Sequence, residues 1–326
     1  MMDVVALGET LIDFTPCGTN AQGMELFARN PGGAPANVLA MNAKLGGKTA
    51  FIGKVGPDAF GNFLRQTLVK SGIDVSGLVV DQKIPTTLAF VQLDSRGDRS
   101  FTFYRNPGAD VLLTSAEVNK ALLDECAIFH FGSVSLTADP SRTATLEAAQ
   151  YARRQGKLVS FDPNYRPPLW ERAEDAIQQM RLSVKLADLV KVSEEEMQLI
   201  TGESDLARGS RALLEMGPSL VLISLGSKGA YYCNAVCAGH LPTYKVTTID
   251  TNGAGDAFMG AVHFQLKGKT AAALKALPES ELAEIVRFAN AAGSLTTTKN
   301  GAIPAMPTRE EILHCISTVP FLDNPD

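Results

Sequence analysis

The chain has 326 residues, and its 45% hydrophobic and 20% charged residues are typical of a soluble globular protein rather than a disordered one. Its formal net charge of -5 argues against the basic surface that nucleic acids or anionic membranes require, so we expect neither as a partner. A small molecule is the expected ligand.

The amino terminus and the cysteines indicate the compartment. The first residues lead directly into the apolar run Val4 to Leu7, with neither a basic leader nor a long apolar stretch. The five cysteines are an odd number without a Cys-x-x-Cys pair, which favours reduced, buried thiols over disulfides or a zinc site. We therefore expect a cytoplasmic protein without a membrane span.

Short apolar runs alternate with amphipathic stretches along most of the chain. In chain order, we expect strand, helix, strand and helix at 3–7, 36–45, 49–55 and 60–71. Further on, the expected strands are 128–131, 158–161, 189–192 and 220–225, and the expected helices include 141–154 and 173–186. This alternation predicts an α/β fold with a doubly wound, mainly parallel sheet and helices on both faces.

Two segments break the alternation. Residues 86–93 and 99–104 are β-rich runs joined by a polar turn, which predicts a hairpin, and residues 14–30 show no helical pattern. We expect them to form a small β-rich lid from two insertions, at about 14–30 and 85–106, that excludes water from a reactive site. The exposed edge of such a lid could pair two copies of the chain into a homodimer.

Four polar clusters follow predicted strands directly, at 8–13, 162–166, 193–196 and 224–229. Ligands of open α/β sheets bind beyond the carboxyl ends of the strands, so we expect these clusters to line one crevice. The second cluster combines Asp162, Asn164 and Arg166, which suit metal-bound water and a transferring phosphoryl group. A plain turn with a surface salt bridge is the alternative. In the third cluster, acids open a predicted helix and are favoured there by its dipole, so only Glu196 is a candidate.

A glycine-rich loop, Pro31-Gly32-Gly33-Ala34-Pro35-Ala36-Asn37, precedes a predicted helix. Its glycines permit the close approach of a ligand, and Asn37 offers a donor and an acceptor for sugar hydroxyls. Asp13 carries an acceptor carboxylate at the end of a hydrophobic run. The alternatives are a structural loop with Pro35 in the first helical turn and an exposed strand end at Asp13.

The segment Asp250-Thr251-Asn252-Gly253-Ala254-Gly255-Asp256 places two glycines and a carboxylate where a loop turns into a helix. Glycines and the unpaired N–H groups of a helix start can hold a phosphate, and the neighbouring Asp256 can take a proton from an attacking hydroxyl. The alternative is an ordinary helix start. The sequence contains neither a complete P-loop nor a Gly-x-Gly-x-x-Gly motif after the first strand.

Together, these motifs resemble those of the ribokinase-like (pfkB-type) carbohydrate kinases, and the resemblance runs over essentially the whole chain. Two separated signatures carry it, namely residues 32–37 with 45–47, 53–58 and Gly61, and residues 250–256. Segments 103–110, 129–133, 162–170 and 191–196 look most like the fructokinase members. The resemblance implies one ribokinase-like catalytic domain over 1–326 that uses ATP and Mg²⁺ to phosphorylate the 6-hydroxyl of fructose.

The resemblance also implies roles for single residues. Asp256 would be the base, assisted by Arg166, and the amides of Gly253, Ala254 and Gly255 would form the anion hole. The sugar would be held by Asp13, Gly32, Gly33, Asn37, Arg105, Arg166 and Asp256. The nucleotide side would use Asn164, Lys191, Ser193, Glu196, Ser224, Gly226, Gly229, Asn290 and Gly293, with Glu196 organising water around Mg²⁺. Ser193 stands where the family motif usually begins with Asn, which weakens the case for a direct contact there.

A potassium site is implied at the carbonyls of Asp250, Asn252, Thr296, Lys299 and Gly301. The nearest alternative substrate is 2-keto-3-deoxygluconate, because Tyr104-Arg105 and Asn164-Tyr165-Arg166 also suit a carboxylate. Aminoimidazole riboside or another sugar is a further alternative. From a different class, a non-catalytic sugar or nucleotide sensor on the same fold is possible, although the chain has Asp256 in place.

Overall fold

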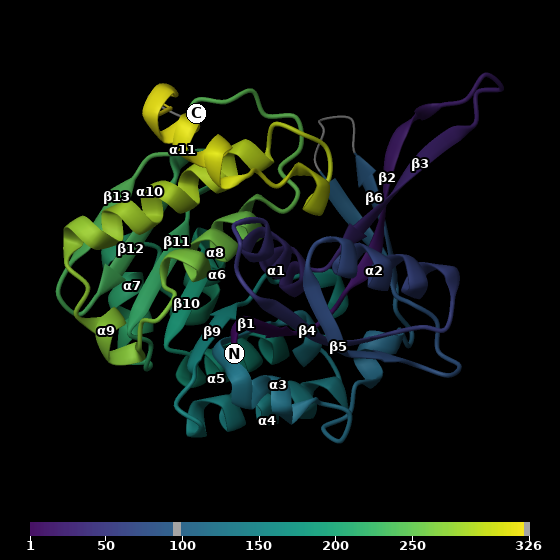
Figure 1. The fold of residues 1–326 in the computed structure, drawn as a ribbon, viewed down its shortest axis with the longest axis horizontal. Coiled ribbons are helices and arrows are strands. Elements are labelled where there is room, and N and C mark those ends of the chain that lie inside the picture. The colour runs from purple at the N-terminus through teal and green to yellow at the C-terminus, as the bar shows by residue number, and fades with distance from the viewer. Residues whose placement is uncertain (94–98, 323–326) are drawn as a thin grey trace.

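The structure is a computed structural model that describes residues 1–93 and 99–322. Its main body is a nine-stranded sheet between two layers of helices (Figure 1). In spatial order, the strands are β13 (Ala238–Leu241), β12 (Ala230–Asn234), β11 (Leu220–Ser224), β10 (Leu189–Ser193), β9 (Leu158–Asp162), β8 (Cys126–Gly132), β1 (Met2–Leu7), β4 (Thr49–Val55) and β5 (Ile73–Val80). Strands β11 to β5 pair in parallel, whereas β12 and β13 are antiparallel, so the predicted mainly parallel sheet is confirmed.

The strands are buried on both faces, which accounts for their continuous apolar runs. In β1, Val4 and Ala6 pack into one hydrophobic cluster, while Val5 and Leu7 pack into the other. The first cluster is covered by α1 (Ala34–Lys44), α2 (Ala59–Lys70), α8 (Ala254–Gln265), α9 (Ala271–Lys275), α10 (Glu279–Thr296) and α11 (Arg309–Thr318). The second is covered by α3 (Lys120–Glu125), α4 (Ser141–Arg154), α5 (Ala173–Leu186), α6 (Glu194–Thr201) and α7 (Leu206–Glu215).

The predicted helices 141–154 and 173–186 are confirmed to the residue. Helix α1 begins at Ala34, two residues before the predicted start, because Pro35 is compatible with the first helical turn. Short 3₁₀ helices lie in the connections, at η1 (Ala109–Leu112), η2 (Val134–Leu136), η3 (Pro167–Leu169), η4 (Gly226–Lys228) and η5 (Ile303–Ala305). No helix among the described residues is long and apolar enough to cross a membrane.

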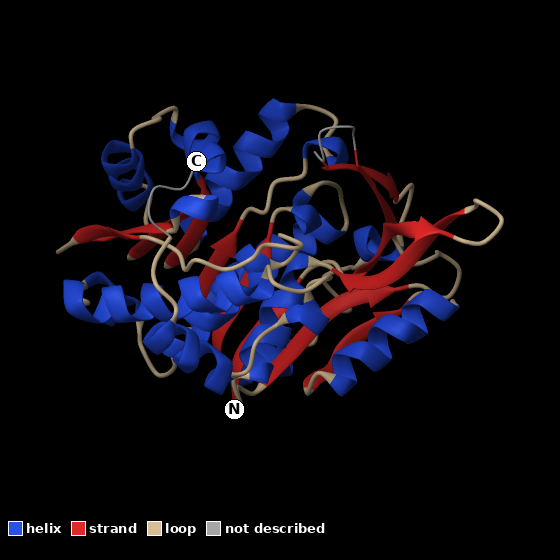
Figure 2. Cartoon of the chain, turned by 90° about the horizontal axis from the view of Figure 1, so that it is seen from above, coloured by secondary structure: helices blue, strands red, loops and turns tan. Residues whose placement is uncertain are grey.

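A second, four-stranded sheet projects from the main body (Figures 1 and 2). Its order is β3 (Glu25–Gly32), β2 (Leu11–Thr19), β6 (Leu88–Leu93) and β7 (Arg99–Tyr104). The predicted β6–β7 hairpin is confirmed, and its turn, 94–98, lies outside the described residues. Segment 14–30, which was expected to be part of the β-rich lid, belongs to a second hairpin, β2–β3. Phe14 packs on Phe90 of β6 within this sheet, with ring centroids 4.9 Å apart, and on Phe60 of α2 in the main body, with ring centroids 5.8 Å apart.

The strand order reverses at β1. The chain proceeds from β1 to β4 and β5 on one side, and then returns to add β8, β9, β10 and β11 on the other. The connections that leave the carboxyl ends of β1 and β8 therefore diverge, which opens the crevice where ligands of doubly wound sheets bind.

Candidate active site

A cavity of about 340 Å³ lies at this crevice, and we call it the first cavity. It is lined by Glu9, Leu11, Asp13, Gly33, Ala34, Asn37, Phe103, Val134, Asn164, Arg166, Leu169, Lys191, Thr251, Asn252, Gly253, Gly255 and Asp256. The structure thus brings together the polar clusters after β1 and β9, the glycine-rich loop before α1 and the segment before α8. Strands β2 and β7 of the small sheet contribute Leu11, Asp13 and Phe103.

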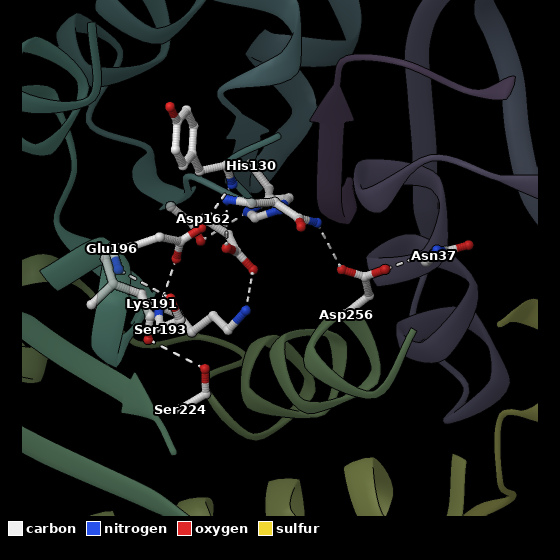
Figure 3. A network of polar contacts seen from close by, with 12 residues as sticks. Asn37, His130, Asp162, Lys191, Ser193, Glu196, Ser224 and Asp256 are labelled. Carbon is white, nitrogen blue, oxygen red and sulfur yellow. Dashed lines mark hydrogen bonds and ion pairs between the residues drawn. The ribbon is translucent and has the colours of Figure 1, made fainter. Parts of the chain in front are cut away.

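Asp256 is the third residue of α8 and is buried at the floor of this cavity. The side-chain amide of Asn37 donates to its Oδ2 at 2.8 Å, and that of Asn164 donates to its Oδ1 at 3.3 Å (Figure 3). These amides come from α1 and from the loop after β9, so the carboxylate is held from two sides. Asn164 has φ 45°, and it is the one non-glycine residue with positive φ in the described part of the chain.

The surroundings of Asp256 make it a better proton acceptor than an exposed carboxylate. Burial is the largest cause and raises its pKa, and the negative charge of Asp162 acts in the same direction. The hydrogen bond from Asn37 and the cations Lys191 and Arg166 oppose this rise. Raised carboxyl pKa values of this kind suit general-base work near neutral pH.

The turn before α8 is shaped to accept an anion. Gly253 is the N-cap residue, with φ 76° and no side chain to cap the helix, so the first N–H groups of α8 face the cavity region without a side-chain partner. A Cβ atom on Gly255 would lie 3.0 Å from Nζ of Lys191, which places this ammonium group against the same turn. Helix dipole, backbone amides and lysine therefore favour negative charge at one point.

Lys191, on β10, links this turn to a second cavity of about 310 Å³. Its Nζ pairs with Oδ2 of Asp162 at 2.8 Å, and both side chains are buried. The second cavity is lined by Asn164, Tyr165, Arg166, Pro167, Lys191, Ser193, Glu195, Glu196 and Leu199. Two of the four predicted clusters therefore line the first cavity, and the cluster 193–196 lines the neighbouring one.

Glu196 and Ser193 have a clear structural role. Ser193 is the N-cap of α6 and forms a capping box with Glu196, whose Oε2 accepts from the backbone N–H of Ser193 at 2.7 Å. Oε1 accepts from the N–H of Tyr165 at 2.7 Å. Burial raises the pKa of Glu196, and Asp162 adds to the rise. The described residues include no group of three or more His, Cys, Asp or Glu side chains that could hold a metal ion.

Several sugar-binding candidates meet in the first cavity. Gly33 has φ 108°, and any side chain there would collide with the carbonyl of Glu9. Gly32 lies against the carboxylate of Asp13, whose pKa burial raises to about 7, with Arg166 opposing the rise. The buried Oδ1 of Asn37 accepts no hydrogen bond from the described residues. The cavity therefore presents acceptors that suit hydroxyl donors.

Glu9 is a cavity residue that the sequence reasoning missed. It is buried, and its Oε1 accepts from the backbone N–H of Ala34 at 2.9 Å, which fixes the start of α1. Its Oε2 is buried without a partner among the described residues, and burial raises its pKa to about 7. Its position in the cluster 8–13 directly after β1 could have identified Glu9 as a candidate, in addition to Asp13.

Arg105 is not among the described residues that line either cavity, and its predicted contact with the sugar stays a prediction. Its guanidinium pairs with Asp110 through Nε at 2.8 Å and Nη2 at 2.7 Å. The remaining bonds go to Thr137 and to the carbonyl of Val134. The sequence expectation that Arg105 reaches the sugar from the hairpin did not take this buried partner into account.

Five of the predicted nucleotide-binding residues are not among the described residues that line either cavity, namely Ser224, Gly226, Gly229, Asn290 and Gly293. Ser224 ends β11 and bonds to the carbonyl of Val192, while Gly226 and Gly229 form the η4 turn. Asn290 uses its amide to hold the carbonyls of Leu241 and Pro242, and Gly293 packs against the carbonyl of Ala254. Their assignment to the nucleotide stays a prediction.

The segments proposed for potassium lie side by side. The Oδ2 atom of Asp250 accepts from the N–H of Gly301 at 2.9 Å, and its Oδ1 accepts from the N–H of Asn252 at 2.8 Å. Thr296 is buried in the last turn of α10, whereas the side chain of Lys299 is exposed and pairs with Glu311 at 3.5 Å. The side chain of Lys299 is thus directed to Glu311, which leaves its carbonyl as the candidate ligand.

Comparison with known proteins covers almost the whole chain. Residues 1–309 match the description pfkB family carbohydrate kinase. The chain is similar to Fructokinase-1 of Zea mays, at 45% identity over 319 residues that cover 96% of this chain and 97% of the relative. The fold is similar to that of a fructokinase with bound ATP from Xylella fastidiosa, with a TM-score of 0.90, 34% identity, and 97% and 99% of the two chains covered. It is also similar to a double mutant of the fructokinase of Vibrio cholerae O395 with fructose, ADP and a potassium ion bound, with a TM-score of 0.86, 34% identity, and 97% and 98% covered.

Proposed function

The chain belongs to the pfkB family of carbohydrate kinases, and we propose that it transfers the γ-phosphoryl group of ATP to the 6-hydroxyl of D-fructose, giving fructose 6-phosphate and ADP. It is a phosphotransferase that acts on a sugar hydroxyl. The observation that carries the proposal is the position of Asp256, a buried carboxylate between two side-chain amides and beside an anion-binding turn. Relatives that are fructokinases, one with fructose and ADP bound, support fructose as the acceptor.

In the proposed mechanism, Asp256 takes the proton of the sugar hydroxyl as the oxygen attacks the γ-phosphorus in line with the leaving oxygen. Asn37 and Asn164 keep the carboxylate aimed at that proton. The amides of Gly253, Ala254 and Gly255, together with Arg166, stabilise the charge that spreads over the transferring group. Asp13, Gly33 and Asn37 hold the other hydroxyls of the sugar in the first cavity.

We propose that Mg²⁺ enters with the ATP phosphates, because the described residues supply no complete metal cage. Magnesium keeps several waters in such sites, which fits the carboxylate of Glu196 at the wall of the second cavity as an outer partner. When bound, the ion neutralises charge on the phosphates. Lys191, close to both cavities, supplies a second positive charge there.

We propose a potassium ion at the carbonyls of the 250–252 and 296–301 segments. The support is the hydrogen bond from Gly301 to Asp250, which joins the segments beside the anion-binding turn, and the potassium bound to the related Vibrio cholerae protein. Replacing K⁺ by Na⁺ at constant ionic strength should lower kcat. Equal kcat in the two salts would contradict the proposed potassium site.

The four-stranded sheet is proposed as the lid of this single catalytic domain, because Leu11, Asp13 and Phe103 reach the first cavity from its strands. We also infer a homodimer through β3. This strand lies at the sheet edge, and its hairpin exposes Met24, Leu26 and Phe27. Light scattering should give the mass of a dimer for the natural chain and of a monomer for Leu26→Lys. A monomeric natural chain would contradict this inference.

The test of the function is a coupled assay of ADP release with fructose, 2-keto-3-deoxygluconate, ribose or no sugar. Fructose should give the highest kcat/KM and the no-sugar control close to none. A preference for 2-keto-3-deoxygluconate would favour the alternative assignment as a 2-keto-3-deoxygluconate kinase. Equal turnover with and without sugar would contradict every proposal that the protein is a sugar kinase. Binding of fructose and ATP without any turnover would indicate a sensor.

A further inference from the structure

Arg105 and Asp110 form a closed, buried ion pair at the end of β7. Their side chains are 6% and 3% exposed, and Oδ2 of Asp110 accepts from both Nε and Nη2 of Arg105. The other carboxylate oxygen, Oδ1, accepts from the hydroxyl of Thr87 at 2.5 Å. Nη1 of Arg105 donates to Thr137 at 2.7 Å, and Nη2 also donates to the carbonyl of Val134 at 3.1 Å. Every nitrogen of this guanidinium is therefore bonded to the protein.

The pair lies directly behind one wall of the first cavity. Val134, whose carbonyl accepts from Arg105, lines that cavity, and so does Glu9. The pKa of Glu9 is influenced by both members of the pair, with Asp110 raising it and Arg105 lowering it after the larger effect of burial. The charge of Arg105 would thus reach a substrate at this wall if Asp110 did not cancel it.

The cavity itself is rich in carboxylates. Glu9, Asp13 and Asp256 line it, whereas its described lining cations are Arg166 and Lys191, and Lys191 is already paired with Asp162. A substrate carboxylate near Glu9 and Asp13 would lose its hydration and, above the pKa of about 7 of these two groups, would meet like charges, which is unfavourable. An uncharged polyol meets acceptors that its hydroxyls can satisfy.

We propose that Asp110 is a specificity residue, which holds and neutralises Arg105 behind the wall and so makes the enzyme reject sugar acids in favour of neutral sugars. The proposal rests on the sugar kinase function and deepens it. The selectivity against sugar acids arises because Asp110 neutralises a cation that would attract their carboxylate, and not from an additional contact with fructose. Loss of the Asp110 charge would leave the buried Arg105 guanidinium with an uncompensated positive charge behind the cavity wall, and this charge would attract a substrate carboxylate in the cavity.

The experiment compares kcat/KM for 2-keto-3-deoxygluconate with kcat/KM for fructose, at saturating ATP. In Asp110→Asn, which keeps the shape of the side chain and removes its charge, the acid-to-fructose ratio should rise about tenfold or more, mainly through a lower KM for the acid. The matched control is Thr87→Val, which deletes the hydroxyl that bonds Asp110 and leaves the charge in place. Its ratio should stay within about threefold of the natural value.

A second variant assigns the effect to Arg105. Combining Asp110→Asn with Arg105→Gln removes the uncompensated cation, so the gain for the acid should disappear. If Asp110→Asn turns over too slowly to assay, thermal unfolding with and without 2-keto-3-deoxygluconate gives the same comparison, and the acid should stabilise the variant more than the natural chain. An unchanged ratio or unchanged stabilisation, or a gain that persists without Arg105, would overturn the proposal. Failure of the sugar kinase function itself would show separately, as a natural enzyme without sugar-dependent turnover.

Discussion

The side-chain amide of Asn37 donates to Oδ2 of Asp256 at 2.8 Å, which ties the first turn of α1 to the first turn of α8. The two residues stand 219 positions apart in the chain. The same residue lines the first cavity, and its buried Oδ1 has no partner among the described residues. Asn37 is therefore suited to touch the base and the sugar at once, so that substrate binding and base orientation are coupled.

Asn164 is the second residue whose side-chain amide bonds the carboxylate of Asp256. Two replacements of Asn164 distinguish its effect on the orientation of this carboxylate from its effect on the stability of the fold. Asn164→Gly keeps a residue that adopts φ 45° without strain and removes the amide that bonds Oδ1 of Asp256. We expect kcat to fall about tenfold to 100-fold, since a misaligned base is costly, with KM for ATP little changed. Steady-state kinetics measure this, and a kcat within twofold of the natural value would remove Asn164 from the orienting role.

Asn164→Ala is the matched comparison. Alanine also lacks the amide but tolerates positive φ poorly, so we expect a similar kcat and an additional loss of about 1 kcal/mol in the free energy of unfolding. Chemical denaturation of both variants measures the difference. Equal stability of the two would show that the backbone relaxes at this position.

Glu9 should give the ligand-free protein a characteristic dependence on pH. Burial raises its pKa from 4.5 to about 7, so between these values the folded protein holds a proton that the unfolded chain has released. The stability associated with Glu9 is complete below pH 4.5 and is lost as the pH rises through 7. The loss amounts to at most roughly 3 kcal/mol, from the difference between the two pKa values.

Glu9→Gln keeps an acceptor for the N–H of Ala34 and cannot ionise. Thermal unfolding of both proteins from pH 5 to pH 8 isolates the contribution, because the other groups that titrate are common to the two. The variant should gain in Tm relative to the natural chain as the pH rises. Parallel curves would mean that the carboxyl of Glu9 has an ordinary pKa.

Gly253 should be the less replaceable of the two glycines before Asp256. It has φ 76°, and a Cβ there would lie 2.5 Å from Cβ of Ala302, whereas a Cβ on Gly255 would meet only the flexible end of Lys191. Gly253→Ala should therefore destabilise the protein by roughly 1–3 kcal/mol more than Gly255→Ala and raise KM for ATP. Urea unfolding and ATP titrations check this, and the reverse order would contradict the proposed geometry of the turn.

The alternation of apolar and amphipathic segments predicted six strands of the main sheet and several of its helices, because buried parallel strands and helix faces leave strong periodic signals. It did not predict β5, the antiparallel strands β12 and β13, or helices such as α10 and α11. Segment 14–30 was expected to belong to a β-rich lid, but the separate strands β2 and β3 were not delimited. Most of their residues are half-buried or exposed, and Pro16 and Gly18 interrupt the pattern, so no alternation marks them. The contact of Phe14 with Phe90 joins β2 to β6, and such long-range contacts cannot be seen in the local sequence.

Site residues could be predicted from the sequence where they lie together in one short motif, as in 250–256. They could not be predicted where the interacting residues are distant in the chain and meet only in the fold. The ion pair of Arg105 with Asp110 could not be predicted from the sequence, because it forms only when η1 packs against the end of β7. The sequence therefore suggested a contact of Arg105 with the sugar. Glu9 was passed over because its burial cannot be seen in the sequence. The capping box of Ser193 and Glu196 could have been recognised from its Ser-x-x-Glu spacing.

The turnover of Asp256→Asn with ATP and fructose tests the central claim most directly. Asparagine fills the same space and cannot accept the hydroxyl proton as a base, so kcat should fall by about 10² or more while fructose and ATP still bind. Binding is measured by calorimetry on the same variant. A kcat close to that of the natural enzyme would contradict the assignment of Asp256 as the base.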